Sequence, residues 1–211
     1  MNFAYKLRNL IERDVFSKED LKVILGPMSD AAINSGITRS LNSKDILKLK
    51  RGLYLFAKNL RKGPISKSLI ANKLYNPSYI SFESALSYYG LIPETVYTTT
   101  SACFRRKNKM FSNELGDFSF DYIPSNPFFM GVISDEGVLV ATVLRALFDL
   151  IYIRRKKYGS VGELYSDLRI EKSLLKIEVL KFSSKELEIL ARSYGKKNVY
   201  KLFEILVRAF K

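Results

Sequence analysis

Polar side chains that can hydrogen-bond to nucleic-acid bases recur along a short segment near residue 35. They are Asn34, Ser35, Thr38, Arg39 and Asn42. Arginine can pair with guanine through two hydrogen bonds, asparagine can do the same with adenine, and serine or threonine hydroxyls reach bases or phosphates. These residue types therefore favour contacts in the major groove of DNA. The alternative is an ordinary polar helix face that is exposed to solvent.

Apolar residues in the same segment explain why these side chains would share one face. Ile33, Ile37 and Leu41 recur at intervals of four, which predicts a helix with a buried stripe. Ser29 is a suitable N-cap for it. Gly36 lies inside this helix at a cost of about 1 kcal/mol relative to alanine, so packing against the rest of the fold must support the helix.

A basic hairpin is predicted directly after this helix. Two short apolar runs flank a turn that contains Gly52, and this pattern is typical of a β-hairpin. Cations at or near such a turn suit contacts with backbone phosphates, and a lysine at the end of the helix can join them. The candidate phosphate-binding residues are Lys44, Lys48, Lys50 and Arg51.

Two further helices are expected before residue 29. Phe3, Leu7 and Leu10 recur at helical spacing, and Ser17 is a good N-cap for a second helix that Gly26-Pro27 ends. Three helices followed by a hairpin is the order of a winged helix-turn-helix. The sequence therefore predicts an α+β protein with a winged helix-turn-helix at residues 1–60, a linker at 61–66 and a mixed α+β domain at 67–211.

The second part mixes helices and strands. Its apolar patterns predict helices at 67–74, 81–89, 140–153, 184–194 and 198–210, and strands near 96–100 and 118–123. Two basic clusters occur here. Arg105, Arg106, Lys107 and Lys109 follow a predicted strand, and Arg154, Arg155, Lys156 and Lys157 follow the long helix. Either cluster would suit a nucleic-acid surface or an acidic partner, and the second would also suit the negative end of the helix dipole.

The charge balance is strongly basic. Lys and Arg number 35 against 21 Asp and Glu, which gives a net charge of +14 and attracts polyanions. The alternative explanation of this charge is an AT-rich genome, whose codons encode many lysines whatever the function of the protein. Residues 1–64 hold 13 Lys and Arg against 6 acids, a net charge of +7, and the other 147 residues carry the same net charge. The excess is therefore about twice as dense in the first part, which favours a DNA-binding role there.

The sequence offers few groups of residues that could act together in catalysis. The chain has no histidine and one cysteine, Cys103, which excludes Ser-His-Asp triads, histidine metal sites and an intrachain disulfide. The carboxylates show no paired spacing, and Asp149 lies one helical turn from Arg145, which predicts a structural ion pair. We expect no cofactor, no metal and no enzymatic activity. A signal-peptide pattern is missing, and the apolar run 138–153 is interrupted by charges, so we expect a cytoplasmic protein without a membrane partner.

Three stretches resemble the AbiEi family of antitoxins. They are the wing Leu49-Lys50-Arg51-Gly52-Leu53-Tyr54, the run from Tyr79 through Ser81-Phe82-Glu83-Ser84-Ala85-Leu86 to Gly90-Leu91-Ile92-Pro93-Glu94, and Ala146-Leu147-Phe148-Asp149-Leu150, with Pro64 in the linker. The resemblance covers roughly residues 1–155 and is most specific in the Tyr-Ile-Ser-x-Glu-Ser-Ala-Leu run. Members are the regulator halves of type IV toxin–antitoxin and abortive-infection systems.

The resemblance implies a winged helix that represses its own operon by binding promoter repeats. It also implies a second domain that counters a nucleotidyltransferase-like toxin without a stable complex. Lys48, Lys50 and Arg51 correspond to the family's basic wing. Two alternatives stay open: a regulator of another operon with a sensor or protein-interaction domain, and, more remotely, an enzyme of nucleic-acid metabolism.

Overall fold

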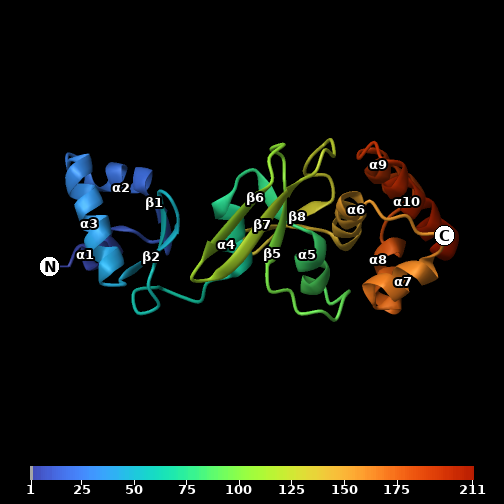
Figure 1. The fold of residues 1–211 in the computed structure, drawn as a ribbon, viewed down its shortest axis with the longest axis horizontal. Coiled ribbons are helices and arrows are strands. Elements are labelled where there is room, and N and C mark those ends of the chain that lie inside the picture. Colours follow the sequence, from blue (N-terminus) through green and yellow to red (C-terminus); the bar gives the residue numbers. More distant parts are fainter. Residues whose placement is uncertain (1) are drawn as a thin grey trace. The chain divides into compact units, whose positions relative to one another are not determined.

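The structure is a computed structural model that describes residues 2–211. These residues form a mixed α+β fold with ten helices and two β-sheets (Figure 1). The chain divides into two compact units. The first comprises Met1–Ser66 and Phe111–Leu115, and the second comprises Lys67–Met110 and Gly116–Lys211.

Three helices and a three-stranded sheet make up the first unit. In chain order they are α1 (Phe3–Leu10), β1 (Val15–Ser17), α2 (Lys18–Leu25), α3 (Asp30–Asn42), β2 (Ile46–Lys50) and β3 (Leu53–Phe56). The predicted hairpin is confirmed: β3 pairs antiparallel with β2. It also pairs with β1, a strand that the sequence did not predict because three residues are too few to show alternation. Phe16 of β1 is completely buried in the core of this unit, beside Leu7, Ile33 and Phe56.

The helix ends of this unit follow from their capping residues. Ser17 accepts a hydrogen bond from the backbone N–H of Asp20, and the Asp20 carboxylate accepts one in return from the N–H of Ser17. Gly26 ends α2 with a positive φ of 58°, and the Ser29 side chain caps α3. All three assignments were predicted from the sequence and are confirmed.

Gly36 allows α1 and α3 to approach each other closely. A Cβ atom at this position would lie 2.7 Å from ring atoms of Phe3, which is closer than carbon atoms can approach. The ring of Phe3 therefore occupies the space that a side chain would need. This packing supplies the support that the glycine in the middle of α3 requires.

The second unit contains a six-stranded sheet and seven helices. Its helices are α4 (Lys67–Leu74), α5 (Phe82–Tyr88), α6 (Val143–Arg154), α7 (Val161–Leu168), α8 (Lys172–Leu180), α9 (Ser184–Arg192) and α10 (Lys197–Phe210). The strands of this sheet are β4 (Ser78–Ile80), β5 (Thr99–Cys103), β6 (Lys109–Asn113), β7 (Gly116–Tyr122), β8 (Val132–Asp135) and β9 (Val138–Ala141). They are arranged in the order β6-β7-β5-β4-β9-β8. The last three residues of β6 belong to the first unit.

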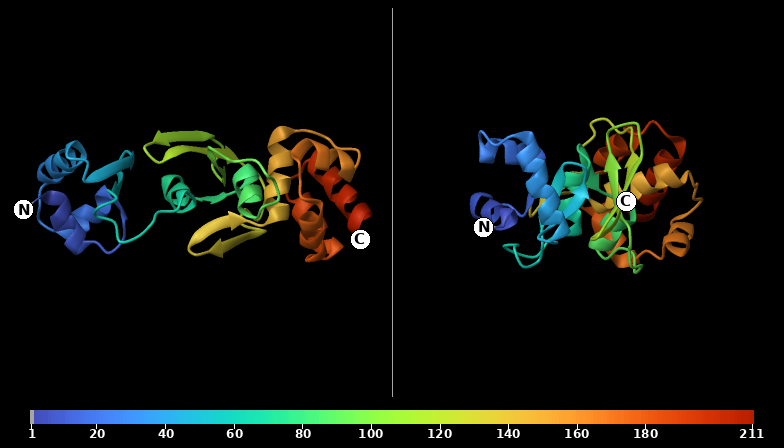
Figure 2. Two further views of the ribbon diagram at one scale, coloured as in Figure 1. Left: turned by 90° about the horizontal axis from the view of Figure 1, so that it is seen from below. Right: turned by 60° about the vertical axis from the view of Figure 1, so that its left-hand side comes forward.

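The sheet is mixed, and helices pack against its strands. Strand β4 is antiparallel to β5 and parallel to β9, whereas β5 is parallel to β7. Helix α4 packs on β4, β5 and β9, and α5 packs between β5 and α6. The carboxy-terminal helices α7 to α10 gather beside α6 (Figure 2). Helix α6 thus lies at the centre of the second unit.

Two predicted elements of this unit were wrong in their bounds. The strand expected at 96–100 is β5, which begins at Thr99. The helix expected from 140 begins at Val143, because β9 occupies 138–141 and the Thr142 side chain caps α6. A continuous apolar run suits a buried strand as well as a buried helix, so periodicity alone could not separate them. Strands β4, β6, β8 and β9 and helices α7 and α8 were not predicted.

The segment after β3 remains attached to the first unit as far as residue 62. The guanidinium of Arg61 donates a hydrogen bond to the carbonyl of Phe56 at 2.7 Å, and the N–H of Lys62 donates one to Asp14 Oδ1 at 3.1 Å. Only residues beyond Lys62 lead on to α4. In the part of the chain that the structure describes, no helix combines the length and the hydropathy needed to span a membrane.

Candidate nucleic-acid interface

The polar side of α3 is exposed, as its spacing predicts. The side chains of Asn34, Ser35, Thr38, Arg39 and Asn42 all lie outside the buried core, at the surface or partly covered. On the opposite side of the helix Ile33, Gly36, Ile37 and Ser40 are buried. The structure therefore brings all five candidate base-reading residues onto one accessible side of the helix.

Two hydroxyl groups of α3 are engaged in hydrogen bonds within their own helix. Thr38 Oγ1 donates to the carbonyl of Asn34 and Ser40 Oγ donates to the carbonyl of Gly36, both at 2.9 Å. Thr38 therefore offers a methyl group and an acceptor rather than a donor. The side chain of Arg39, by contrast, forms no ion pair within residues 2–211, so its guanidinium donors face solvent.

The hairpin that follows α3 carries the remaining candidates. Lys44 lies in the turn before β2, and Arg51 lies in the turn between β2 and β3, where Gly52 adopts a φ of 77° that a side chain would resist. Lys44 and Arg51 are exposed, and Lys50 is half-buried. The Lys50 ammonium lies 6.0 Å from the centre of the Phe111 ring in the same unit.

Most acids of the first unit are held in ion pairs. These four acids are Asp14, paired with Arg8 at 2.6 Å, Asp30 with Lys22 at 2.9 Å, Asp20 with Arg13 and Glu12 with Lys62. Glu19 of α2 is exposed and forms no ion pair within residues 2–211. A hydrogen bond from Lys22 lowers the pKa of Asp30, so this carboxylate stays ionised at neutral pH. Each of these ion pairs neutralises one cation of the first unit.

Four of the candidate cations form no such ion pair within residues 2–211. Between Asp30 and Glu83 the chain has a single acid, Asp45, whose carboxylate accepts hydrogen bonds from Asn2 and Ser43. These four cations are Arg39, Lys44, Lys48 and Arg51. The result is a continuous run of chain with positive charge and almost no negative charge.

The second predicted basic surface belongs to the second unit. Arg105, Arg106 and Lys107 are exposed in the loop between β5 and β6, and exposed Lys109 begins β6. The guanidinium of Arg105 lies 5.6 Å from the centre of the Tyr75 ring. This cluster is therefore accessible.

A buried polar network lies at the centre of the second unit. The predicted pair is confirmed: Arg145 Nε lies 3.2 Å from Asp149 Oδ1, and both side chains are completely buried. Asp149 also accepts hydrogen bonds from Ser81 at 2.6 Å, Tyr194 at 2.6 Å and Tyr79 at 2.9 Å. Burial and the nearby Asp149 carboxylate raise the pKa of both tyrosines well above the ordinary value.

The remaining hydrogen bonds of the network satisfy the donors of the Arg145 guanidinium. Its guanidinium donates to Ser125 Oγ at 2.7 Å and to the carbonyls of Met130 and Phe128 at 3.1 and 3.2 Å. Burial by itself would lower the pKa of Arg145, but Asp149 and the two tyrosines raise it beyond its ordinary value. Every charge here is paired and shielded from solvent, so the arrangement joins β4, α6 and the end of α9 and has no access to a substrate.

This network explains the motif that carries the family resemblance. Tyr79 and Ser81 come from the Tyr-Ile-Ser-x-Glu-Ser-Ala-Leu run, and Asp149 comes from the Ala-Leu-Phe-Asp-Leu stretch. Two segments that lie about 70 residues apart in the sequence therefore meet on one carboxylate. The residues that make the resemblance specific are thus residues that hold the second unit together.

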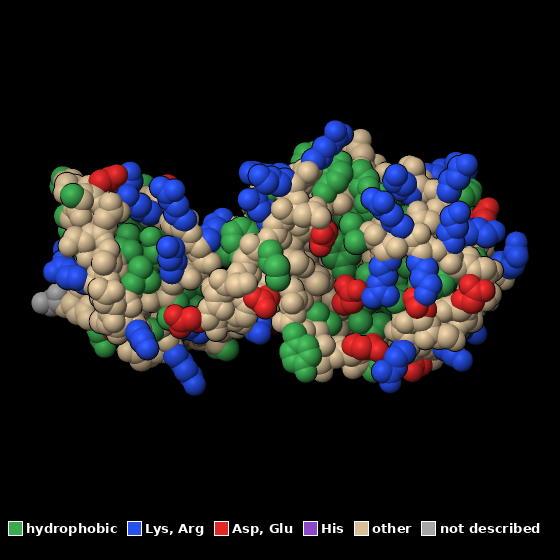
Figure 3. Space-filling view, viewed as in Figure 1, with side chains coloured by type: hydrophobic (Ala, Val, Ile, Leu, Met, Phe, Trp, Pro, Cys, Tyr) green, Lys and Arg blue, Asp and Glu red, His purple; other side chains and the backbone are tan. Residues whose placement is uncertain are grey.

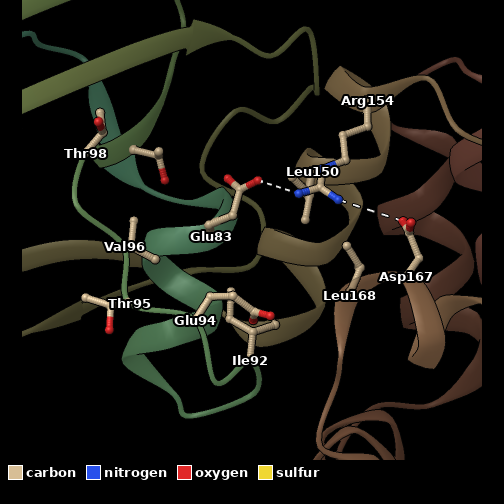
Figure 4. Close-up of a pocket in the computed structure, with 11 residues that line it drawn as sticks. Glu83, Ile92, Glu94, Thr95, Val96, Thr98, Leu150, Arg154, Asp167 and Leu168 are labelled. Atoms are coloured by element: carbon tan, nitrogen blue, oxygen red, sulfur yellow. Dashed lines mark hydrogen bonds and ion pairs between the residues drawn. The ribbon is translucent and has the colours of Figure 1, made fainter.

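A pocket of about 330 Å³ opens beside α5 and α6 in the same unit (Figure 4). At its edge Arg154 donates a hydrogen bond to Glu83 at 2.9 Å and lies 3.8 Å from Asp167. Ile92, Leu150 and Leu168 give it apolar walls. Because Arg154 neutralises two of its carboxylates, the pocket does not offer the pair of free carboxylates that hydrolytic acid–base chemistry needs.

The described residues give no sign of metal or thiol chemistry. Residues 2–211 contain no group of three or more thiols and carboxylates that could hold a metal ion. Cys103 is completely buried, and burial raises the pKa of its thiol to about 11. The thiol is therefore protonated at neutral pH and out of reach of solvent.

The fold occurs in a solved mycobacterial protein. The chain is similar to the structure titled "Crystal structure of RV2827C protein from Mycobacterium tuberculosis", with a TM-score of 0.65 and 17% sequence identity. The match covers 99% of this chain and 75% of that chain. At this identity the likeness concerns the fold alone. No protein-family model matches the sequence, and no curated protein matches it.

Several residues that matter in the second unit could not be found from the sequence. The helical spacing shows Arg145 and Asp149 but not their partners Ser125 and Tyr194, which are distant in the chain. The run from Arg154 to Lys157 looks like one cluster, yet in the structure Arg154 and Lys156 pair with Asp167, whereas Arg155 and Lys157 do not. A charge run alone carries no information about such a division.

Proposed function

We propose that the first unit is a winged helix-turn-helix that binds double-stranded DNA, with α3 in the major groove and the β2–β3 hairpin as the wing. The proposal rests on one observation above all. Within residues 2–211 no carboxylate forms an ion pair with Arg39, Lys44, Lys48 or Arg51, whereas four acids of the first unit are paired with other cations. An unpaired cation can release counterions from DNA, whereas a paired one must first lose its partner.

We further propose that the chain is the antitoxin of a type IV toxin–antitoxin system. It would repress its own operon through promoter repeats and counter a nucleotidyltransferase-like toxin without forming a stable complex with it. The resemblance to AbiEi proteins supports this role, and the accessible polar face of α3 is compatible with it. The proposal involves no catalytic activity and no cofactor.

A regulator of another operon is the second candidate. The 330 Å³ pocket in the second unit favours it, because a sensor domain needs a cavity for its ligand. The gene content next to the coding sequence separates the two candidates. A neighbouring gene for a nucleotidyltransferase-like protein, whose toxicity this chain relieves on co-expression, supports the antitoxin. Undiminished toxicity supports the regulator.

The wing is tested by the salt dependence of DNA binding. The Lys48→Ala/Arg51→Ala variant should weaken binding to all duplexes and reduce the slope of log K against log salt by about 0.9 for each phosphate that is no longer neutralised. Lys62→Ala is the control, because Lys62 is paired with Glu12. Fluorescence anisotropy over a salt series gives both slopes. An unchanged slope in the double variant would show that the wing does not contact the phosphates of the DNA backbone.

The recognition helix is tested by sequence discrimination. Footprinting on the protein's own upstream region first identifies the bound site. Arg39→Ala or Asn42→Ala should then cost about 1–3 kcal/mol at that site and leave binding to random duplexes almost unchanged. Equal losses on both duplexes would place these side chains on phosphates. Failure of every duplex to bind would refute the proposed function itself.

A further inference from the structure

A basic groove opens on the second unit, where three segments that are distant in the sequence meet. It has a volume of about 700 Å³ and lies between the end of α6, the turn from α9 to α10 and the edge formed by Asn108 and Asp121. Four cations line it: Arg155, Lys157, Lys196 and Lys197. Asp121 is the one acid among the lining residues, and its carboxylate accepts a hydrogen bond from Asn108 at 2.8 Å.

The four cations at the end of α6, residues 154–157, fall into two groups: two form ion pairs and two line the groove. Arg154 binds Glu83 and Asp167, and Lys156 also binds Asp167. The alternate residues, Arg155 and Lys157, are exposed, line the groove and have no carboxylate partner among residues 2–211. Stabilisation of the end of α6 accounts for one or two cations at this point. It does not account for two unpaired cations in a groove shared with Lys196 and Lys197.

The two lysines on the other wall occupy an unfavourable position for a cation. Lys196 is the N-cap of α10 and Lys197 is its first residue, so both lie at the positive end of the helix dipole. The first turn of α10 contains no acid, and no side chain caps it, whereas α9 is capped by a reciprocal pair of hydrogen bonds between Ser183 and Glu186. An anion bound among these lysines would offset their mutual repulsion and accept hydrogen bonds from the free amides of α10.

The walls of the groove are held in a fixed relation. The Asn198 side chain in the first turn of α10 donates a hydrogen bond to the carbonyl of Ile151 in α6 at 2.7 Å. The Tyr152 ring lines the groove and lies 6.1 Å from that of Tyr194, which belongs to the buried network. In Figure 3 Lys and Arg side chains gather over α6, α9 and α10. Arg155 directly follows α6 and Lys196 and Lys197 begin α10, and the hydrogen bond of Asn198 joins these two helices.

We propose that this groove is a phosphate-binding site for a nucleotide or for the end of a nucleic-acid strand. Arg155, Lys157, Lys196 and Lys197 surround the phosphate, the N-terminus of α10 donates to its oxygens, and Tyr152 offers an aromatic face to the base. The site consists of residues of the second unit, and it does not depend on the function proposed for the first unit.

Isothermal titration of the full-length protein tests the site with two probes, ATP and a single-stranded RNA of about eight nucleotides. Binding of ATP that inorganic phosphate displaces identifies a free nucleotide as the ligand. Binding of the RNA alone identifies a strand phosphate. In either case the Arg155→Ala/Lys197→Ala variant should bind at least about tenfold more weakly, because it loses charge-assisted hydrogen bonds. Binding of neither probe at millimolar concentration would overturn the proposal.

Two matched variants separate the groove from general electrostatic attraction. Lys156→Ala/Lys181→Ala removes the same charge from lysines that are paired with Asp167 and Glu178, and it should bind both probes as the native protein does. Lys176→Ala/Lys185→Ala removes the same charge from exposed lysines of α8 and α9 that do not line the groove, and it should also leave this binding unchanged. Equal weakening in either control would overturn the proposal. If Arg155→Ala/Lys197→Ala does not fold, Lys157→Ala carries the same expectation, because Lys157 lies outside the helices.

Discussion

Removing the Asp149 carboxylate should destabilise the second unit severely. In Asp149→Ala the buried Arg145 guanidinium loses its counter-charge, and the hydroxyls of Tyr79, Ser81 and Tyr194 lose their acceptor. Breaking a buried ion pair from one side costs about 3–5 kcal/mol. Three orphaned hydroxyls bring the expected loss to the upper end of that range, which is a large share of the stability of a typical domain.

Urea denaturation followed by circular dichroism measures this loss. Two units can give two transitions, so the curve is fitted with both, and only the transition of the second unit should move. Glu204→Ala is the matched control. It breaks the exposed pair between Lys201 and Glu204, and it should leave the free energy of unfolding almost unchanged.

A double variant separates the cost of an unpaired charge from the cost of poorer packing. Arg145→Met/Asp149→Leu removes both buried charges together, and such replacements are often neutral or stabilising. It should recover most of the stability that Asp149→Ala loses, although the tyrosine hydroxyls stay without their acceptor. A loss below about 1 kcal/mol in Asp149→Ala, or no recovery in the double variant, would refute the reasoning.

Three further predictions concern single positions. Gly36→Ala forces a Cβ atom against the Phe3 ring and should destabilise the first unit by about 1–3 kcal/mol in urea denaturation; wild-type stability would show that the ring yields freely. Ser17→Ala removes the reciprocal cap with Asp20 and should cost about 1 kcal/mol, and no loss would mean that the cap is redundant. The Cys103 thiol should react with a disulfide reagent only in denaturant. Since folding raises its pKa from 9.0 to about 11, its contribution to stability is complete below pH 9 and is lost as the pH rises toward 11.

Local interactions made much of the first unit predictable. The caps Ser17 and Ser29, the helix end at Gly26 and the accessible face of α3 all depend on residues within one or two turns of each other. Strand β1 was missed because its pairing partner, β3, lies about 40 residues later and the strand itself is too short to show a pattern. Local chemistry is therefore visible in a sequence, whereas pairing between distant segments is not.

Long-range contacts explain what could not be predicted in the second unit. The spacing of Arg145 and Asp149 showed their pairing, but no pattern could show that Tyr79 and Tyr194 approach the same carboxylate. In the same way, the apolar run from 138 divides into a strand and a helix because β9 pairs with β4 and β8. The division depends on neighbours supplied by the rest of the fold.

The shielded position of the one thiol makes the chain a ready template for site-specific labelling. Cys103 is enclosed and protonated, so it should give almost no background with maleimide reagents on the native protein. A cysteine introduced by Ser35→Cys on α3 or by Lys157→Cys beside the groove would then be the single reactive group. Fluorophores or cross-linkers placed there could report separately on the two surfaces, with the unaltered protein as the blank.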